Sequence, residues 1–327
     1  MVLLSNPLAD PRRDACPPSR TLSSVKPRVT SSQFFTYSIM ISNLQVDVYV
    51  APAAPIATGH LDPSKRWFSP TSCTLIQGPT SAVLVDTPAT IELSEGLAAW
   101  VKKTAPGKKL LYIYNTHLHG DHFLGNPIIL RHFPEAKCVA IVSVVDGIRK
   151  QWPGSLAFWD KLFPNKQIAG DQHIPIALPA DGKFDIDGHL LQGIDVPHSD
   201  TDASSFLHVP DLKLVVCGDI VYGDCYQFLG EANTPEKRQM WLRSLDQIAA
   251  LDPHIVVPGH KRASQIDGSY LIEATRAYIL AFEEELEKAG DSEKLEEAMI
   301  RRYPQRLNRF LLEQSCQRTW STLGSED

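Results

Sequence analysis

The chain has 327 residues, of which 43% are hydrophobic, and its formal net charge at pH 7 is −6. This composition is typical of a globular protein with a sizeable core, and the acidic balance argues against a nucleic-acid partner, because nucleic-acid-binding surfaces are basic. No stretch approaches the roughly 18 consecutive apolar residues of a membrane span. The six cysteines form no C-x-x-C pair, so we expect reduced thiols, a cytoplasmic location and no membrane partner.

The beginning of the chain differs in composition from the rest. Residues 1–39 are rich in Pro, Ser and Arg and have no periodic apolar pattern, so we expect a disordered N-terminal extension. Met40 is a candidate alternative start. We expect the remainder to comprise a catalytic domain, residues 40–269, and a C-terminal helical extension packing on it, residues 270–327.

Apolar periodicity predicts strands first and then strands mixed with helices. Residues 44–50 alternate apolar and polar side chains, and residues 72–88 hold two apolar runs around a Gly-Pro turn, which is typical of a hairpin. Residues 91–104 carry apolar side chains at helical spacing. The same criteria predict later helices within residues 123–133 and 143–151, from 270 and from about 292, and strands within residues 108–116, 137–142, 193–222 (three strands) and 253–260.

This order does not follow a strict alternation of strand and helix. It favours an α/β (α+β) fold in which two sheets pack together with helices outside them. The clusters of polar residues all fall where an apolar strand run ends, which is where sites on a rigid scaffold are commonly assembled.

The segment NTHLHGDHFLGN, residues 115–126, contains the densest of these clusters: His117, His119, Asp121 and His122. Histidine is neither a strong helix former nor a favoured strand residue, and a buried imidazole needs a partner. A metal ion explains the cluster. Because alternate side chains of an extended loop point the same way, His117 and His119 can face one ion while Asp121 and His122 face another, with Gly120 allowing the bend.

Three further candidate ligands follow predicted strands, namely His198, Asp219 and His260. A catalytic zinc takes three protein ligands and keeps one position open, so the candidates divide into two sites and a bridge. The first site contains His117, His119 and His198, and the second contains Asp121, His122 and His260. Asp219 lies between the two ions as the bridge. Two metals ~3.5–4 Å apart can share a hydroxide and bring the pKa of water from ~15.7 towards ~7. Cys217 is the weaker candidate for the bridge, because only Asp219 sits in the G-D pattern.

Several other residues have two readings. Asp86 either orients a ligand histidine or forms a turn, and Thr201 and Asp202 either support His198 or belong to a simple polar loop. Residues 151–167, which carry four aromatic side chains, either form a flap over a substrate pocket or an amphipathic helix on the core. The histidines outside the pattern are expected to be ordinary surface or core residues: His132, His173, His189, His208 and His254.

The motif at residues 117–122, followed in order by His198, Asp219 and His260, resembles that of the metallo-β-lactamase-fold superfamily of hydrolases over roughly residues 44–265. The resemblance implies an αββα sandwich of two mixed β-sheets flanked by helices, with a dinuclear metal site that usually holds zinc. The ligand set matches the glyoxalase II, lactonase and ribonuclease Z type rather than the β-lactamases with a cysteine ligand. Tyr222 matches a tyrosine that assists the developing oxyanion in acyl-homoserine lactone lactonases.

These observations together predict a metal-dependent hydrolase with two Zn²⁺ per chain, Mn or Fe being open alternatives. We expect it to open a lactone or lactam by attack of a metal-bridging hydroxide, with Asp121 orienting the nucleophile and Tyr222 stabilising the oxyanion. The partner is then a small carbonyl substrate, hydrophobic or aromatic because of residues 151–167, and a homodimer is left open. The alternatives are a thioesterase similar to glyoxalase II and a mononuclear iron persulfide dioxygenase, while the acidic balance argues against a nuclease.

Overall fold

The computed structural model describes residues 42–59, 66–152, 154–170 and 173–324. The predicted disordered extension, residues 1–39, and the candidate start at Met40 lie outside the described residues. Residues 42–327 cluster as a single unit, and the account below concerns that unit alone.

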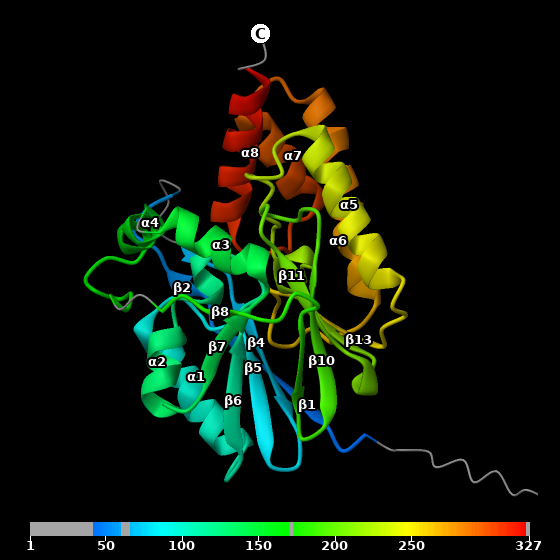
Figure 1. The fold of residues 1–327 in the computed structure, drawn as a ribbon. Coiled ribbons are helices and arrows are strands. Elements are labelled where there is room, and N and C mark those ends of the chain that lie inside the picture. Colours follow the sequence, from blue (N-terminus) through cyan, green and yellow to red (C-terminus); the bar gives the residue numbers. More distant parts are fainter. Residues whose placement is uncertain (1–41, 60–65, 153, 171–172, 325–327) are drawn as a thin grey trace, which may run out of the picture. The chain divides into compact units, whose positions relative to one another are not determined.

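The first of two large sheets is built mainly from the N-terminal half of the unit (Figure 1). Its six strands run in the spatial order β1 (Gln45–Ala51), β4 (Thr71–Gln77), β5 (Ser81–Val85), β6 (Lys109–Tyr114), β7 (Lys137–Ala140) and β8 (Ile176–Ala177). The β1–β4 and β4–β5 pairs are antiparallel, whereas β5, β6, β7 and β8 are parallel. The predicted strand at 44–50 and the predicted hairpin within 72–88 are confirmed.

The second sheet comes from the middle of the chain. Its five strands lie in the order β13 (Ile255–Val257), β12 (Leu214–Val216), β11 (Ser205–Val209), β10 (His189–Asp195) and β9 (Lys183–Ile186). The β12–β13 pair is parallel and the others are antiparallel. A short antiparallel pair, β2 (Ala54–Pro55) and β3 (Trp67–Phe68), stands apart from both sheets.

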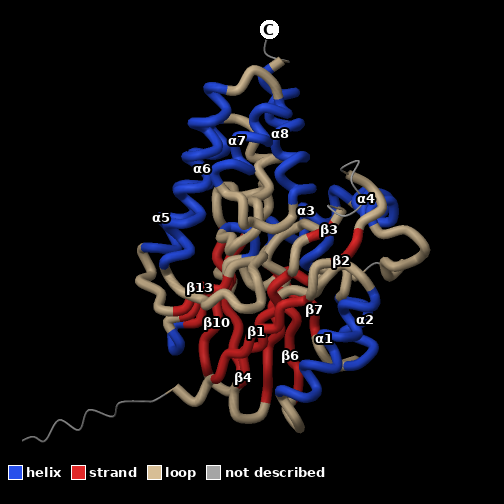
Figure 2. Tube along the Cα trace, turned by 180° about the vertical axis from the view of Figure 1, so that it is seen from behind, coloured by secondary structure: helices blue, strands red, loops and turns tan. Residues whose placement is uncertain are grey.

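The two sheets pack face to face. One apolar cluster joins Val83 and Val139 of the first sheet to Leu207 and Val216 of the second, and all four are buried. A second cluster joins the outer side of the first sheet to helix α1 (Ile91–Thr104) and helix α2 (Asn126–His132). With helices also on the second sheet (Figures 1 and 2), the predicted αββα sandwich of two mixed sheets is confirmed.

Local signals explain where the helices begin and end. The hydroxyl of Thr90 accepts a hydrogen bond from Leu93 N, which caps α1, and basic Lys102 and Lys103 lie in its last turn, where they favour the helix dipole. The predicted helix at 91–104 is therefore confirmed. Helix α3 (Val142–Gln151) is also confirmed, starting one residue earlier than predicted. The strand predicted at 137–142 is two residues shorter and ends at Ala140, because the helix starts at Val142.

Some elements were not predicted from the sequence. The short strands β2, β3 and β8 lack a recognisable periodicity, whereas helix α4 (Gly154–Leu162) falls within residues 151–167, for which an amphipathic helix was one of the two alternatives. Helix α5 (Pro235–Ala249) carried a usable signal, because Thr234 caps it and Pro235 occupies its first turn.

The C-terminal helices share a core with the second sheet. Helices α5, α6 (Tyr270–Lys288), α7 (Ser292–Arg302) and α8 (Arg309–Leu323) contribute to a cluster that also contains Phe206, Val215 and Val256. The predicted helices from 270 and from about 292 are confirmed, and α8 extends the helical region further. None of the helices in the described part of the chain has both the length and the apolar composition needed to cross a bilayer.

The ends of several strands converge at one edge of the sandwich. Asp86 follows β5 and Asn115 follows β6, and these two strands are parallel; Asp219 and His260 lie just beyond the parallel strands β12 and β13. Parallel neighbours deliver the residues after them to the same edge of a sheet. The fold therefore gathers the polar strand-end segments in one place.

We predict that α8 contributes to the stability of this core. Leu312 is fully buried in the cluster with the second sheet, so Leu312→Ala is expected to lower the free energy of unfolding by about 2–5 kcal/mol. The matched control is Leu280→Ala in α6, where the side chain is 46% exposed and the expected change is about 0.5 kcal/mol. Urea unfolding measures both, and equal losses in the two variants would contradict the prediction.

Candidate metal centre

The histidine-rich segment begins as an extended loop and ends in a tight turn. Asn115 Nδ2 donates to the carbonyl of His122 (2.8 Å), and Asn126 Nδ2 donates to Asn115 Oδ1 (2.8 Å), so the two ends of the loop are tied together. Residues Gly120–His122 form a 3₁₀ turn. This change from extended to turned backbone directs the side chains before and after Gly120 to different places.

Gly120 is needed for space rather than for the bend. Its φ is not among the positive backbone angles of the described glycines, but a Cβ there would lie 2.4 Å from the indole nitrogen of Trp159. Gly218 is different, because it has φ of +50° and a Cβ there would lie 2.3 Å from Thr116 Oγ1. Both glycines let neighbouring elements approach the histidine loop closely.

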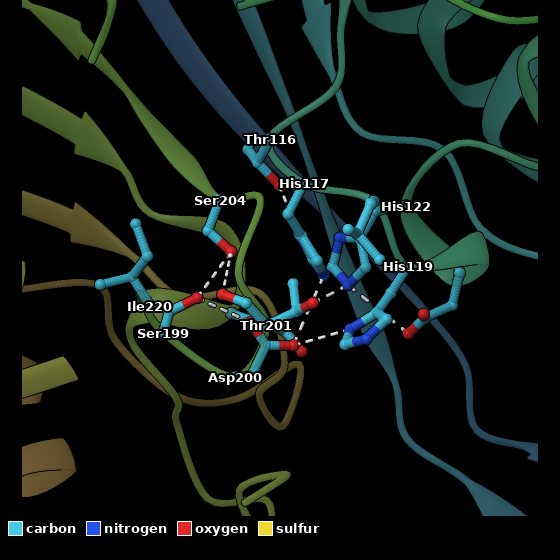
Figure 3. A network of polar contacts seen from close by, with 12 residues as sticks. Thr116, His117, His119, His122, Ser199, Asp200, Thr201, Ser204 and Ile220 are labelled. Atoms are coloured by element: carbon cyan, nitrogen blue, oxygen red, sulfur yellow. Dashed lines mark hydrogen bonds and ion pairs between the residues drawn. The ribbon is translucent and has the colours of Figure 1, made fainter. Parts of the chain in front are cut away.

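A first group of donor atoms contains His117, His119 and Asp200. Asp200 Oδ2 lies 2.7 Å from His119 Nδ1 and 3.8 Å from His117 Nε2 (Figure 3). The three donor atoms all lie within 4.8 Å of one another. The pairing of His117 with His119 is as predicted, whereas Asp200 was not among the predicted residues.

A second group contains Asp121, His122 and His260, as predicted. Asp121 Oδ2 lies 3.5 Å from His122 Nε2 and 3.2 Å from His260 Nε2, and the two imidazole nitrogens are 3.4 Å apart. The ring centroids of His117 and His122 are 4.2 Å apart, so the two groups are neighbours.

Asp219 joins the second group as well. Its Oδ1 lies 3.2 Å from His122 Nε2 and its Oδ2 lies 3.2 Å from His260 Nε2. The hydroxyl of Tyr222 donates to Asp219 Oδ2 over 2.5 Å. Cys217, the weaker candidate for this position, is buried in the apolar core with its thiol facing Val215 O.

These donors fit a metal ion. Among the described side chains, His117 Nε2, both ring nitrogens of His198, Asp200 Oδ2 and Asp219 Oδ1 are buried and have no hydrogen-bond partner. Buried polar atoms are nearly always satisfied, and a buried carboxylate oxygen without a partner is costly. Imidazole nitrogens and carboxylate oxygens are also the usual ligands of zinc and of other first-row transition metals.

The Nδ1 atoms of His122 and His260 each contact an acceptor outside the two donor groups. His122 Nδ1 lies 2.9 Å from Asp86 Oδ2, and His260 Nδ1 lies 2.8 Å from the carbonyl of Pro70. Asp86 also accepts hydrogen bonds from both the amide and the hydroxyl of Thr116 (2.8 Å each). Such contacts fix the tautomer and orientation of a ligand histidine, so the structure agrees with the prediction that Asp86 supports a ligand.

His198 is the predicted ligand that the structure does not bring to either group among the residues it describes. Its Nδ1 faces the carboxylate of Asp202 at 2.8 Å, and its carbonyl accepts a hydrogen bond from Ser244. The contact with Asp202 is at an ion-pair distance, and both ring nitrogens of His198 are buried without a hydrogen-bond partner among the described residues, so the support from Asp202 stays a prediction. Thr201 does not contact His198 but donates to Glu231 Oε2 (2.7 Å).

Electrostatics in the groups favours ionised carboxylates. Burial by itself raises the pKa of Asp121, but His122 and His260 together hold it well below its ordinary value. The same balance of burial against His260 and His122 lowers the pKa of Asp219. His117 differs from its neighbours, because burial lowers its pKa, and a neutral imidazole is the form that binds a metal.

A cavity of about 290 Å³ opens over the second group. His119, Asp121, Asp219 and His260 are at its polar end. Its wall is mainly apolar and comes from four parts of the chain: Phe68; Phe158 and Trp159 of α4; Phe228; and Phe310 and Leu311 of α8. Residues 151–167 therefore line a cavity as well as packing on the core, where Phe163 stacks parallel to Trp159.

Two features of the site escaped the sequence analysis. Glu231 Oε1 lies 3.5 Å from His119 Nε2, and α8 supplies Phe310, Leu311, Gln314 and Arg318 to the cavity wall. A lone glutamate and an amphipathic helix carry no distinctive pattern. Asp200 did carry one, since it stands two residues after His198 in an acidic loop.

Comparison with known proteins agrees with this geometry. A family model described as the metallo-β-lactamase superfamily matches residues 66–260. The chain belongs to the metallo-β-lactamase superfamily. The predicted superfamily is thus confirmed, and the membership together with the donor groups supports a metal cofactor.

One relative is similar to part of the chain. The chain is 31% identical over 93 residues to the mitochondrial persulfide dioxygenase of Bos taurus, an alignment that covers 27% of this chain and 34% of that protein. It therefore spans about a third of the length of that relative.

Solved structures of metallo-β-lactamases show the same fold. A metallo-β-lactamase from Pontibacter korlensis has a TM-score of 0.50 and 19% identity, and the match covers 72% of this chain and 99% of that one. The DIM-1 metallo-β-lactamase exposed to ceftazidime has a TM-score of 0.52 and 17% identity, with coverage of 73% and 98%. At these identities the likeness establishes the fold alone.

We predict that Asp86 controls metal affinity through His122. In Asp86→Asn the amide nitrogen would face the donors that the carboxylate now accepts from, so metal affinity is expected to fall about 10–100-fold. Competition with a chromophoric chelator measures it. The matched control is Asp252→Asn, because Asp252 also has positive φ (47° against 62° for Asp86) but its side chain is 87% exposed. Unchanged affinity in Asp86→Asn would contradict the prediction.

Proposed function

We propose that this protein is a metal-dependent hydrolase that opens a cyclic ester or amide, that is, a lactone or a lactam. The observation that carries the proposal is the pair of neighbouring donor groups, His117–His119–Asp200 and Asp121–His122–His260, beside a cavity with an aromatic wall. Asp219 lies against the second group, 3.2 Å from both His122 and His260, and would add a carboxylate to the residues that hold the metal. Two metal sites in close contact are typical of hydrolytic centres.

A pair of bound divalent ions, zinc in the first instance, supplies an activated water near neutral pH and stabilises negative charge on a carbonyl oxygen. The chain's own residues have separate tasks. Asp121 lines the cavity and its carboxylate is ionised, so it can orient the attacking water and carry a proton to the leaving oxygen or nitrogen. The outer contacts from Asp86 and Pro70 keep His122 and His260 in place.

Tyr222 acts in this proposal through Asp219. Its phenol is fully buried, donates to Asp219 Oδ2 and is not among the residues that line the cavity. Burial, followed by the charges of Asp219 and Asp200, raises the pKa of Tyr222 well above 10, so it remains a neutral donor. We therefore assign it the task of positioning Asp219, and direct stabilisation of the oxyanion is the alternative.

The cavity wall supports a substrate with an apolar or aromatic body. Phe158 is 43% exposed and Trp159 is packed edge-on against Phe68, so together they offer an apolar, aromatic surface near the candidate ligands. Gln151, Gln314 and Arg318 give the same cavity a few polar groups, which fix the orientation of a ligand in a pocket of this kind. A thioester with an aromatic or apolar acyl group would fit the same description.

A second candidate function is an iron-dependent dioxygenase. Two imidazoles and one carboxylate, the composition of the first group, form the ligand set of many non-haem iron oxygenases. The partial similarity to a persulfide dioxygenase points the same way. The complete second group favours the hydrolase, because a mononuclear enzyme does not need it.

The proposal predicts hydrolysis that depends on bound metal. Purified protein is expected to open lactones or lactams with an aromatic or long apolar substituent; a chelator should abolish the activity and Zn²⁺ should restore it. His119→Ala should lower kcat by at least about 100-fold, since it removes a ligand. Elemental analysis of the same preparation decides between the candidates.

Two zinc ions per chain with ring opening support the proposal. A single iron per chain with oxygen consumption would establish the dioxygenase instead. Full activity in His119→Ala would contradict both metal-dependent schemes.

For Tyr222→Phe we predict a fall in kcat of about 10–100-fold with a parallel loss of metal affinity, because Asp219 loses the donor that holds it. Substrate titrations and chelator competition measure the two quantities. The matched control is Tyr226→Phe, whose hydroxyl donates to Tyr303 O outside the site and should affect neither. A fall of about 10²–10³ in kcat with unchanged metal affinity would show that Tyr222 stabilises the oxyanion directly.

A further inference from the structure

We propose that Arg318 of α8 binds a carboxylate carried by the substrate, so that the lactone or lactam opened by this protein bears an acidic group beside its apolar body. The inference rests on the proposed hydrolase function and narrows its substrate class. It concerns the part of the cavity wall that α8 supplies, which lies beyond the residues that the superfamily model matches, 66–260.

Helix α8 presents one face to the cavity. Leu311, Gln314 and Arg318 follow one another at spacings of three and four residues, which places them on the same side of a helix, and all three line the cavity. The helix is anchored close to this face, because Leu229 N donates to the buried hydroxyl of Ser315 (2.9 Å). Gln314 and Arg318 are therefore carried by a rigid part of the wall.

The guanidinium of Arg318 is positioned without using its hydrogen-bond donors. Its central carbon lies over the ring of Phe228, 5.3 Å from the centroid. A Cβ at Gly230 would lie 2.9 Å from Arg318 Cδ, so the glycine leaves room for this side chain. The ion pair with Glu231 spans 3.8 Å from Nη1 to Oε1, which is longer than a hydrogen bond. Within the described part of the chain, no side-chain or backbone oxygen accepts a hydrogen bond from Arg318.

Glu231 does not take up the donors of Arg318, because it is shared with other partners. Its Oε2 accepts a hydrogen bond from Thr201 (2.7 Å), and its Oε1 lies 3.5 Å from His119 Nε2. The side chains of Arg318 and Glu231 are 42% and 38% exposed, and an ion pair that is this exposed and this long contributes little. The guanidinium is therefore held near the candidate ligands with its donors available to a bound molecule.

The same glutamate oxygen limits the distance between Arg318 and the donor groups. Glu231 Oε1 lies 3.5 Å from His119 Nε2 and 3.8 Å from Arg318 Nη1, so these two nitrogens are no further apart than the sum of the two distances. One small molecule can reach both. An aromatic lactone fits this span when its carbonyl lies at the donor groups and an acidic substituent lies on the far side of its ring.

A carboxylate is the group that this guanidinium suits best. Its two oxygens lie in one plane and accept a parallel pair of charge-assisted hydrogen bonds from an arginine. Gln314, one turn earlier on the same face of α8, adds an amide donor. One guanidinium balances the single charge of a carboxylate, whereas a phosphate brings more negative charge close to Glu231.

The first experiment compares an acidic lactone with its neutral counterpart. Carboxyphthalide, an aromatic lactone with a carboxylate on its ring, and the carboxamide of the same skeleton are offered to the full-length protein. We expect the wild type to prefer the acid by at least about 10-fold in kcat/KM, and Arg318→Gln to lower this acid-to-neutral ratio by about 10–100-fold, mainly through KM, because a charge-assisted hydrogen bond is lost. Arg318→Lys keeps the charge without the planar fork and should retain part of the preference.

The matched control is Arg301→Gln in α7. It also removes one arginine, but this side chain is 70% exposed, is paired with Glu297 and is not among the residues that line the cavity. The acid-to-neutral ratio should be unchanged in this variant. Circular dichroism of both glutamine variants shows that they are folded, and Arg318→Lys decides if Arg318→Gln is not.

Binding of a compound that cannot be opened separates this inference from the proposed function. Carboxyphthalan is a cyclic ether of the same skeleton without the carbonyl, and calorimetry measures its affinity and that of its carboxamide. The wild type is expected to bind the acid at least about 10-fold more tightly, and Arg318→Gln to lose that difference. This result supports a carboxylate site at Arg318 even when no lactone is opened, in which case the hydrolase proposal alone fails.

Three results would overturn the inference. Equal affinity of the wild type for the acid and the amide excludes a carboxylate site and leaves the hydrolase proposal standing wherever lactones are opened. A preference for the acid that persists in Arg318→Gln and Arg318→Lys shows that the carboxylate binds the metal ions instead of α8. A preference that falls equally in Arg301→Gln shows an effect of net charge on the whole protein.

Discussion

The site depends on one electrostatic constraint: carboxylates and imidazoles are packed in groups of three whose donor atoms lie within 4.8 Å of one another, and several buried atoms of these residues have no hydrogen-bond partner in the described part of the chain. Charged groups removed from water need either opposite charges or metal coordination. His122 and His260 lower the pKa of Asp121 and Asp219, but they do not satisfy Asp200 Oδ2 or Asp219 Oδ1. Metal coordination would satisfy these atoms, which is why a metal centre explains the site better than any role in stability.

The strands and the residues next to them hold the imidazoles in place through contacts to their outer nitrogens. The parallel pairs β5–β6 and β12–β13 bring their strand ends to one edge, and fixed acceptors there hold the outer nitrogens of the ligand imidazoles. The single carboxylate of Asp86 contacts both the Thr116 backbone and His122, so it orients both. The ligands are therefore placed by packed strands and hydrogen bonds, and the metal does not have to organise the loop.

The cavity is built by different parts of the chain than the donor groups. The ligands lie within the residues that the superfamily model matches, 66–260, whereas Phe310, Leu311 and Arg318 of α8 lie beyond it. Helix α8 is held in place by the same core that supports the second sheet. The candidate ligands and the apolar cavity wall are thus supplied by different elements, and α4 and α8 contribute to the wall alone.

The sequence by itself determined the two sheets and most helices, because period-two and helical patterns reflect which face of each element is buried. It also indicated that six of the seven candidate ligands lie close together, because the H-x-H-x-D-H motif leaves few other uses for its residues. It also pointed to Asp86, which directly follows a strand. Only the tertiary structure decided where the side chains of the polar loop after β10 lie: Asp200 is 2.7 Å from His119, and His198 is 2.8 Å from Asp202. Only the tertiary structure placed Glu231 and α8 at the site as well. Their contacts join residues far apart in the chain, and a local pattern of polar residues does not predict such contacts.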